Sequence, residues 1–462
     1  MSISTFVTML GSAGSAGGAQ PWALRIARNT AGGSGEGIYI TENTITPDHE
    51  NGTYAILYDN KDDNTLVYRI DEDGSVVWRT KQSTTSGFAQ DASGSMGSSG
   101  YSSDLFVMGD FGASNYGYRL NSSGTLQAYA DVWGGKGGVI CSNSNVTNIF
   151  TTNAGSGDYK VQRLNPATME SNYNTNKRIL YINNTSNYYP FKFGPKLVYF
   201  PTDGSHAVYS TVMVSNHSQG VIKSDGTGTY TYKYVNYSGR DTTPSFSQGD
   251  IGKGYYEGGT AKFKYYMTDT STRFHEFTVD KNLDHSGSQY SWTTSGINAY
   301  NTGVTEDSSG NRYFCLGYNS VFKVDTSNNV EWGIQITLSG AGSASYSSQN
   351  ANLSSDEDAL YFSCRIRTSN NYHAATYIIK IPTDGGIAPG TYTDAGTTGD
   401  WQNISITVTD RTSALTPRAT TLTSVSTGSA NVSTNNGSPS DDNVVLSSST
   451  QTAFNGEVLT EL

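Results

Sequence analysis

The sequence predicts an all-β protein, a β-propeller of about seven four-stranded blades, and three observations lead to this fold class. The composition favours strands and turns, a hairpin-like unit recurs along the chain, and the spacing of that unit matches one propeller blade. A ring of six blades is the alternative, because the third copy of the unit has a proline in its turn and a poorly defined last strand.

The composition is that of a folded, strand-rich chain of 462 residues. Glycine (51 residues) permits positive φ angles in turns, and tyrosine (32 residues) fits a half-buried pleated surface. Charged residues make up 15% of the chain, while 35% hydrophobic residues supply material for a core. Helix-forming runs are scarce, so we expect strands joined by Gly-, Asp- and Asn-rich turns.

The recurring unit is a β-run, a turn rich in Gly, Asp or Asn, and a second β-run that carries an aromatic residue. The clearest copies are LVYRIDEDGSVVW and VFKVDTSNNVEW. The equivalent turn positions are Asp71, Asn121, Asn165, Ser224, Asp280, Asp325 and Thr383. Their spacing of 44 to 59 residues fits a four-stranded blade with somewhat long loops. We expect related places in the outer strands for Trp78, Tyr129, Tyr232 and Trp332.

The chain divides into an N-terminal anchoring arm rich in Gly, Ala and Ser (1–20), the propeller (21–400) and a Ser/Thr-rich β extension (401–462). A ring must join its last sheet to its first. The segment around Trp22 resembles the strand around Trp78, so residues 22–28 are expected to complete the seventh blade. The C-terminal extension is expected to wrap its own propeller or a neighbouring subunit.

The arm carries apolar residues ahead of a Gly-rich strap, and these are candidates for anchoring the chain to another subunit. They are Phe6, Val7, Met9 and Leu10. An apolar peg on a flexible strap suits docking into a larger assembly, and a frayed terminus is the alternative. Deleting residues 1–18 is expected to leave the propeller folded and to reduce assembly.

Charge and hydropathy argue against two classes of partner. With a net charge of -11 and scattered Lys and Arg residues, the chain lacks the basic surface that nucleic acid requires. No apolar run approaches the roughly 18 residues of a membrane span, and MSISTFVTML lacks the basic and apolar regions of a signal peptide. We therefore expect a protein made in a cytoplasm and not exported by a signal peptide.

No motif for catalysis, for a cofactor or for zinc is found, so the sequence predicts a protein that is not an enzyme. Cys141, Cys315 and Cys364 lie too far apart for a zinc site and are interpreted as buried small hydrophobes. Calcium is the best inorganic candidate, because acidic turns supply oxygen ligands. The carboxylates concerned are Asp71, Asp73, Asp307, Asp356 and Asp358. The alternative, which we favour, is that they cap their own turns.

Tyrosine doublets are candidate glycan-facing aromatics, because a ring with a hydroxyl group suits stacking on sugars. They are Tyr188, Tyr189, Tyr255, Tyr256, Tyr265 and Tyr266. A doublet on a strand places one ring on each face of its sheet, so one ring of each pair could be exposed. Packing between blades is the alternative.

One copy of the unit carries a resemblance to a known family. Residues 307–313 read DSSGNRY, residues 321–325 read VFKVD and residues 330–332 read VEW. With the start MSISTFVTMLGSAGSAGGAQPW, this pattern resembles the β-propeller-repeat virion proteins of marine tailed bacteriophages. The resemblance implies a tail or fibre component of the virion that docks by its N-terminus, contacts other tail proteins and presents its propeller to a bacterial surface glycan.

Two other functions stay open at this point. One is a stand-alone carbohydrate-binding propeller, a lectin, and the other is a quinoprotein-like enzyme that shares the propeller class. A homo-oligomer is also compatible with the sequence.

Overall fold

The computed structural model of the chain describes the residues in the following ranges: 3–10, 20–28, 37–59, 64–83, 88–94, 104–111, 114–131, 139–141, 149–155, 158–169, 189–190, 196–200, 205–215, 218–224, 230–237, 249–251, 255–270, 272–282, 284, 289–299, 303–317, 319–340, 345–354, 356–367, 374–394, 404–420, 425–428 and 455–458. For several of the strands, including most of blades 3 and 4, the description covers the backbone alone.

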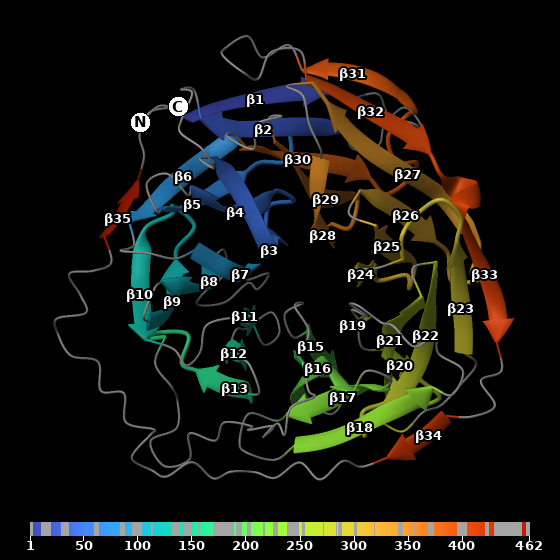
Figure 1. The fold of residues 1–462 in the computed structure, drawn as a ribbon. Coiled ribbons are helices and arrows are strands. Elements are labelled where there is room, and N and C mark those ends of the chain that lie inside the picture. The colour runs from blue at the N-terminus through green and yellow to red at the C-terminus, as the bar shows by residue number, and fades with distance from the viewer. Residues whose placement is uncertain are drawn as a thin grey trace.

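Seven antiparallel sheets stand around a central axis as the blades of a propeller (Figure 1). The all-β prediction is confirmed, and the ring has seven blades where six were the alternative. Within the described ranges the one helical element is a short 3-10 turn, η2 (Thr412–Ala414).

The first four blades follow the chain in order. Blade 1 is β3 (Ile38–Pro47), β4 (Thr53–Asp59), β5 (Asn64–Ile70) and β6 (Val76–Ser83). Blade 2 is β7 (Phe88–Gly94), β8 (Leu105–Phe111), β9 (Ser114–Leu120) and β10 (Leu126–Asp131). Blade 3 is β11 (Val139–Cys141), β12 (Ile149–Gly155) and β13 (Asp158–Leu164). Blade 4 is β14 (Tyr189–Pro190), β15 (Lys196–Phe200), β16 (Ser205–Ser215), β17 (Ser218–Ser224) and β18 (Tyr230–Tyr237).

The last three blades complete the circle. Blade 5 is β19 (Gly249–Ile251), β20 (Tyr255–Glu257), β21 (Thr260–Thr270), β22 (Arg273–Asp280) and β23 (Gln289–Thr294). Blade 6 is β24 (Gly303–Glu306), β25 (Arg312–Leu316), β26 (Ser320–Val324) and β27 (Val330–Ser339). Blade 7 is β28 (Ser345–Leu353), β29 (Ala359–Arg367) and β30 (Ala374–Pro382), followed in space by β2 (Trp22–Arg28) from the other end of the chain.

The ring closes within blade 7, where β2 pairs with β30 in antiparallel register from Trp22↔Lys380 to Ile26↔Thr376. The predicted closing strand is therefore confirmed, with the bounds expected from the sequence. Closing the ring in this way joins the start of the chain to the last inner strands of the propeller by a ladder of main-chain hydrogen bonds.

The core is divided among the interfaces between neighbouring blades. In β2, Trp22, Leu24 and Ile26 pack against blade 1, while Ala23 and Ala27 pack against residues of blades 6 and 7. Both faces of a blade are thus covered, which explains the continuous apolar runs of the inner strands. β5, for example, is buried along its whole length.

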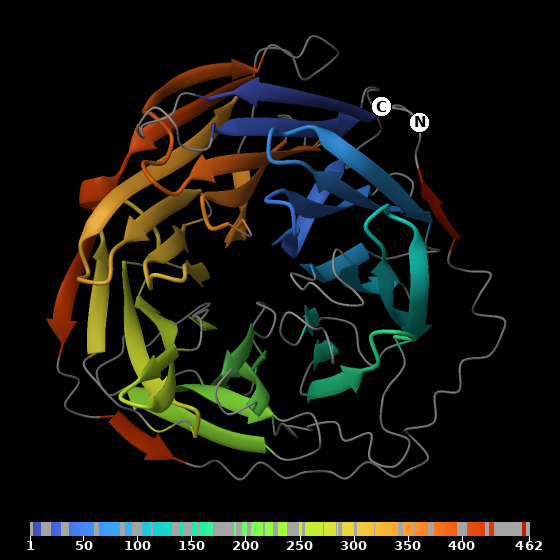
Figure 2. The same cartoon turned by 180° about the vertical axis from the view of Figure 1, so that it is seen from behind.

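The C-terminal residues run back around the outside of the ring and add strands to the outer edges of several blades (Figures 1 and 2). We call β32 to β35 the C-terminal belt. β32 (Ile404–Asp410) pairs with β27 of blade 6, β33 (Leu415–Thr420) with β23 of blade 5, β34 (Val425–Gly428) with β18 of blade 4, and β35 (Asn455–Val458) with β6 of blade 1. β31 (Gly390–Asp394) pairs with the outer side of β32. The belt therefore follows its own propeller, with apolar residues such as Ile404 and Ile406 buried.

The N-terminal residues also join the ring, which corrects the expectation of an anchoring arm separate from the propeller. β1 (Ile3–Met9) pairs with β2 along its whole length and becomes the fifth strand of blade 7. Of the four anchoring candidates, Leu10 is buried in the core between blades 6 and 7, and Met9 is 57% exposed. Phe6 and Val7 belong to β1. The physical reason is that the outer edge of β2 offers backbone groups that need partners.

The outer-strand aromatics are only partly equivalent. Trp78 and Trp332 occupy the same position, since each lies opposite a basic residue of the third strand, Arg69 and Lys323. Tyr129 lies opposite Tyr118, one residue beyond that position, and Tyr232 lies opposite Ile222, which is apolar. The third equivalent is Trp22, which lies opposite Lys380.

Candidate functional site: a polar network where the ring closes

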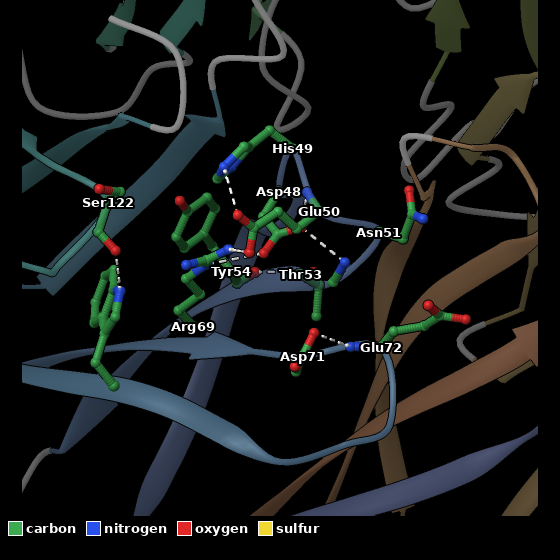
Figure 3. A network of polar contacts seen from close by, with 12 residues as sticks. Asp48, His49, Glu50, Asn51, Thr53, Tyr54, Arg69, Asp71, Glu72 and Ser122 are labelled. Carbon is green, nitrogen blue, oxygen red and sulfur yellow. Dashed lines mark hydrogen bonds and ion pairs between the residues drawn. The ribbon is translucent and has the colours of Figure 1, made fainter.

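A network of polar contacts lies where blade 7 meets blade 1 (Figure 3). It is formed by two turns of blade 1, residues 48–52 between β3 and β4 and residues 71–75 between β5 and β6, together with side chains of blade 7. We call this set of residues the closure site. Both turns leave their strands on the same side of the ring.

Asp48 organises the first turn from a fully buried position. One carboxylate oxygen accepts hydrogen bonds from the amides of Glu50 (2.9 Å) and Gly52 (2.7 Å), and the other accepts one from Nε of Arg69 (2.9 Å). Gly52 is required because a Cβ atom at this position would lie 2.2 Å from the carbonyl oxygen of Ile70. The turn is thereby fixed against β5.

Arg69 connects the buried carboxylate to the surface (Figure 3). Its second contact is with Oε2 of Glu50 at 2.6 Å, and Nε2 of His49 lies 3.2 Å from the other oxygen of Glu50. The hydrogen bond and the charge of Arg69 lower the pKa of Glu50. Burial would lower the pKa of Arg69, but its hydrogen bonds to Asp48 and Glu50 outweigh burial and raise it. Glu50 and Arg69 are therefore both held in their charged forms.

Blade 7 contacts the second turn of blade 1 through Trp22 and Lys380. The indole nitrogen of Trp22 donates to the carbonyl oxygen of Glu72 at 2.8 Å. Nζ of Lys380 donates to the same carbonyl at 3.0 Å and lies 3.2 Å from a carboxylate oxygen of Glu72. The hydroxyl of Tyr361 donates to the carbonyl oxygen of Asn51 at 2.6 Å. The bonds of Lys380 and Tyr361 connect residues about 300 positions apart, and with the bond of Trp22 they join blade 7 to blade 1.

The opposite side of blade 7 carries a second ionic contact with the neighbouring blade. Nη1 of Arg25 in β2 lies 2.8 Å from a carboxylate oxygen of Asp394 in β31, and both side chains are buried. The hydroxyl of Tyr377 donates to the same oxygen at 2.7 Å. Burial raises the pKa of Tyr377, so the phenol stays protonated and can donate this bond.

The contacts of Trp22 recur at two other blades. Trp78 of blade 1 donates its indole N–H to the carbonyl oxygen of Ser122 at 2.6 Å, and Trp332 of blade 6 donates to that of Thr383 at 3.2 Å. In all three cases the acceptor belongs to the turn after the third strand of the next blade.

Three blades share a row of side chains, a tyrosine, a cation and a tryptophan, on strands two, three and four. The rows are Tyr54–Arg69–Trp78, Tyr313–Lys323–Trp332 and Tyr361–Lys380–Trp22. We call them aromatic–cation rows. The sequence carried a signal for two of them: a basic residue two positions before the turn aspartate and a tryptophan seven positions after it.

The closure site is therefore built to fix turns and to join blades. Each charged group of Asp48, Glu50 and Arg69 is engaged with another group of the same network. In the described ranges no group of three or more His, Cys, Asp or Glu side chains is arranged to hold a metal ion.

The five carboxylates considered for calcium lie at turns, and four of them accept hydrogen bonds from groups of their own turn. Asp71 accepts from the amide of Glu72, Asp73 from the amide of Ser75, and Asp356 from the hydroxyl of Ser354. Asp307 accepts from the backbone and side chain of Asn311. The bond from Ser75 lowers the pKa of Asp73. These contacts match the turn-capping interpretation.

The structure corrects part of the tyrosine prediction. Tyr265 and Tyr266 are both buried: Tyr265 stacks on Phe277, and Tyr266 makes an edge contact with Phe314 of blade 6. A doublet does alternate between faces, but both faces of a blade are covered by neighbours, so neither ring reaches a glycan.

The remaining predicted positions have different outcomes. Tyr255 and Tyr256 in β20 are half-buried. Tyr189 is in β14, and Tyr188 lies outside the described residues. Cys315 and Cys364 are free and buried, as predicted. Cys141 is in β11. The described part of the chain contains no helix with the length and apolarity needed to cross a membrane.

No protein-family model matches the chain, and no curated protein matches it. Among solved structures, the Dos1 propeller is 10% identical with a TM-score of 0.41 and covers 78% of this chain and 95% of its own. The calcium-binding protein regucalcin from Agrobacterium tumefaciens str. C58 is 12% identical with a TM-score of 0.36, covering 76% and 93%. The subtype N11 neuraminidase-like protein of A/flat-faced bat/Peru/033/2010 (H18N11) is 12% identical with a TM-score of 0.37, covering 83% and 98%. Likeness at this level carries no argument about function.

Proposed function

We propose that the chain is a non-enzymatic structural protein of a tailed-bacteriophage particle, a tail or fibre component. In this proposal the propeller is a rigid disc that contacts neighbouring particle proteins and presents a surface to a bacterial glycan. The proposal rests first on the sequence resemblance described above. The structural observation that supports it is the way in which both chain ends are built into the outer rim.

Strands from both ends of the chain cover outer edges of the ring. β1 covers β2 in blade 7, and the C-terminal belt covers the outer strands of blades 6, 5, 4 and 1. Unfolding such a ring requires the added strands to separate as well as the blades, which raises the barrier to unfolding. A particle protein needs this kind of kinetic stability, because outside a cell no chaperone can refold it.

The closure site supports a structural role for its charged groups. A catalytic acid or base must exchange a proton with a substrate, and its pKa is commonly tuned toward the working pH. Here Arg69 does the reverse, since it lowers the pKa of Glu50 and binds the buried Asp48. The network is therefore better suited to stabilising the turns than to acting as a catalytic acid or base.

A stand-alone carbohydrate-binding propeller is the second candidate, and one observation favours it. Tyr255 and Tyr256, in the short strand β20, are half-buried, in contrast to the fully buried Tyr265 and Tyr266. A glycan array tests this candidate with a Tyr255→Ser variant and a Val77→Ser variant as the control, because Val77 is exposed on another blade. Glycan binding lost only in Tyr255→Ser supports it, and the absence of binding by the unchanged protein contradicts it.

A mass-spectrometric inventory of purified particles tests the first candidate. The expected result is that the protein co-purifies with intact particles at a fixed copy number, and that antibodies against it label the tail in electron micrographs. Finding the protein in infected-cell extracts and never in purified particles would contradict the proposal.

A further inference from the structure

In the described part of the chain, the interface between blades 5 and 6 has no tryptophan bond of the kind found at three other interfaces. At those interfaces an indole N–H donates to a carbonyl oxygen in the turn after the third strand of the next blade. Trp292, in strand β23 of blade 5, is fully buried. Its indole nitrogen has no hydrogen-bond partner among the described residues. Blade 5 is therefore joined to blade 6 in another way.

Arg312 of β25 takes the bonding position that an indole has at the other interfaces. Its Nη2 donates to the carbonyl oxygen of Asp325 at 2.7 Å, in the turn after the third strand of blade 6. Its Nη1 lies 2.6 Å from Oε2 of Glu276 in blade 5, and both side chains are buried. A buried ion pair adds little net stability, because the cost of removing two charges from water offsets their attraction. The Arg312 bridge therefore sets the geometry of the interface more than its strength.

The C-terminal belt crosses the same interface on the outside of the ring (Figure 1). β32 ends at Asp410 on blade 6, and β33 begins at Leu415 on blade 5. Only residues 411–414 lie between these two strands, and they include the 3-10 turn η2. We call residues 411–415 the clasp.

The clasp is hydrogen-bonded to both blades. On blade 6, the amide of Arg411 donates to the carbonyl oxygen of Gly333 at 2.7 Å, and the amide of Gly333 donates to Oγ1 of Thr412 at 3.0 Å. On blade 5, the amide of Ser295 donates to the carbonyl oxygen of Ala414 at 2.8 Å. The clasp thus spans the gap between the outer strands of two neighbouring blades.

The clasp also completes the apolar core between these blades. Ala414 and Leu415 are buried in one cluster with Phe274 and Trp292 of blade 5 and Phe314 of blade 6. Burial of apolar side chains is the dominant favourable contribution to packing of this kind. The strength that the ion pair does not supply therefore depends on residues from the end of the chain.

We infer that the clasp locks blade 5 to blade 6, in place of the tryptophan bond used at three other interfaces. The lock comes from residues that follow the last blade in the chain, so this interface is completed only when the C-terminal belt has docked. When the clasp is released, blades 5 and 6 separate before the blades that a tryptophan bond joins. The inference does not depend on the proposed role in a virus particle.

Thiol labelling of the full chain can compare the two faces of blade 6. Cys315 is buried in the core that blade 6 shares with blade 7, so its labelling reports opening of that interface. Val324 is fully buried in the core shared with blade 5, and a Val324→Cys substitution reports opening of the interface held by the clasp. Iodoacetamide labelling followed by peptide mass spectrometry gives the rate at each position. The variants below are made in this background.

Leu415→Ala removes the largest apolar side chain that the clasp places in the core. We expect labelling at position 324 to become about ten-fold faster or more, while labelling of Cys315 changes by less than about two-fold. Thr412→Val keeps the shape of the side chain and removes the acceptor for the Gly333 amide, so it tests the clasp without a cavity. It is expected to accelerate labelling at position 324 by about three-fold.

Ile406→Ala is the matched control, because Ile406 is a buried residue of the same belt but packs in the core between blades 6 and 7. That interface keeps the bond from Trp332 to the carbonyl oxygen of Thr383. We therefore expect the labelling of Cys315 to rise by less than about three-fold.

Two results overturn the inference. An unchanged rate at position 324 in both Leu415→Ala and Thr412→Val would show that the Arg312 bridge holds the interface without the clasp. An equal acceleration at position 324 by Leu415→Ala and at Cys315 by Ile406→Ala would show that the belt supports both interfaces alike, with no special role at blades 5 and 6.

Discussion

The interface between blades 7 and 1 and the interface between blades 1 and 2 use the same aromatic–cation row but place the cation's partner differently. In blade 1, Arg69 binds Asp48 and Glu50 of its own blade. In blade 7, Lys380 reaches across to Glu72 of the next blade. The tryptophan of each row makes the same bond, from Trp78 to Ser122 and from Trp22 to Glu72.

The difference follows from how the ring is connected. Blades 1 and 2 follow one another along the chain, so the cation of blade 1 can be used to fix a turn within that blade. Blade 7 combines β1 and β2 from the start of the chain with β28 to β30, and the contacts of Lys380 and Tyr361 link this later part of the chain to turns formed near its start. The same position in the repeat thus stabilises a turn in one place and ring closure in another.

The largest expected effect is at the buried ion pair. Asp48→Ala leaves Arg69 without its buried partner and removes the acceptor for two turn amides. We expect the free energy of unfolding to fall by about 3 to 5 kcal/mol in urea denaturation. The control Asp73→Ala removes an exposed turn carboxylate and is expected to cost less than about 1 kcal/mol. Similar losses for the two variants would show that Asp48 does not organise the site.

The next effect concerns a close approach between blades 1 and 2. Gly124 has φ = +78°, and a Cβ atom there would lie 2.6 Å from Cε3 of Trp78. Gly124→Ala is therefore expected to destabilise the protein by about 2 to 4 kcal/mol, through backbone strain and displacement of the indole.

Gly258→Ala is the control for that variant, since Gly258 also has a positive φ of 57° but no atom lies within 4 Å of the added Cβ. It is expected to cost about 1 kcal/mol from strain alone. If the two alanine variants melt at the same temperature, the contact with Trp78 is not what restricts position 124 to glycine.

A direct comparison of the two interfaces uses Trp22→Phe and Trp78→Phe. Each variant removes an indole N–H and leaves a turn carbonyl without that donor. We expect a loss of about 1 to 3 kcal/mol, larger for Trp22, because its side chain is fully buried and lies at the closure of the ring. Thermal unfolding measures the two losses. A larger loss for Trp78 would show that the interface between blades 1 and 2 depends more on its indole hydrogen bond than the interface between blades 7 and 1 does.

The smallest effect is a pH dependence in blade 2. Burial raises the pKa of Asp104 to about 6, against the opposing charge of Arg119. The folded protein therefore binds a proton more tightly than the unfolded chain, so stability increases as the pH falls from about 7 to 4. We expect a contribution of about 1 to 2 kcal/mol over this range. Asp104→Asn is expected to flatten this part of the curve, and an unchanged slope would assign the effect to another group.

The repeat was the part of the fold that could be predicted from sequence, because each blade must place a turn between two strands at nearly the same interval. The closing strand could be predicted as well, since Trp22 repeats the setting of Trp78. The routes of residues 3–9 and of the C-terminal belt could not, because pairing at an outer edge depends on which edge is nearby in the folded ring. Short strands such as β34 and β35 carry too few residues to show a pattern.

The candidate site was less accessible to sequence reasoning. The tyrosine prediction treated a blade as a sheet with one open face, and Tyr265 and Tyr266 show that neighbouring blades bury both faces. The aromatic–cation rows were visible in the spacing of Arg69, Asp71 and Trp78. The groups that each row contacts belong partly to the neighbouring blade, and the spacing of residues in the sequence does not show these contacts.

The two ends of the described chain finish on adjacent blades, β1 on blade 7 and β35 on blade 1 (Figure 1). Both lie at the rim, away from the central axis. A short linker could therefore join β35 to β1, and new termini could be opened in a turn elsewhere, to give a circularly permuted propeller with the same seven sheets. By the same geometry, a domain fused to either end would extend sideways from the disc and leave both of its flat faces accessible.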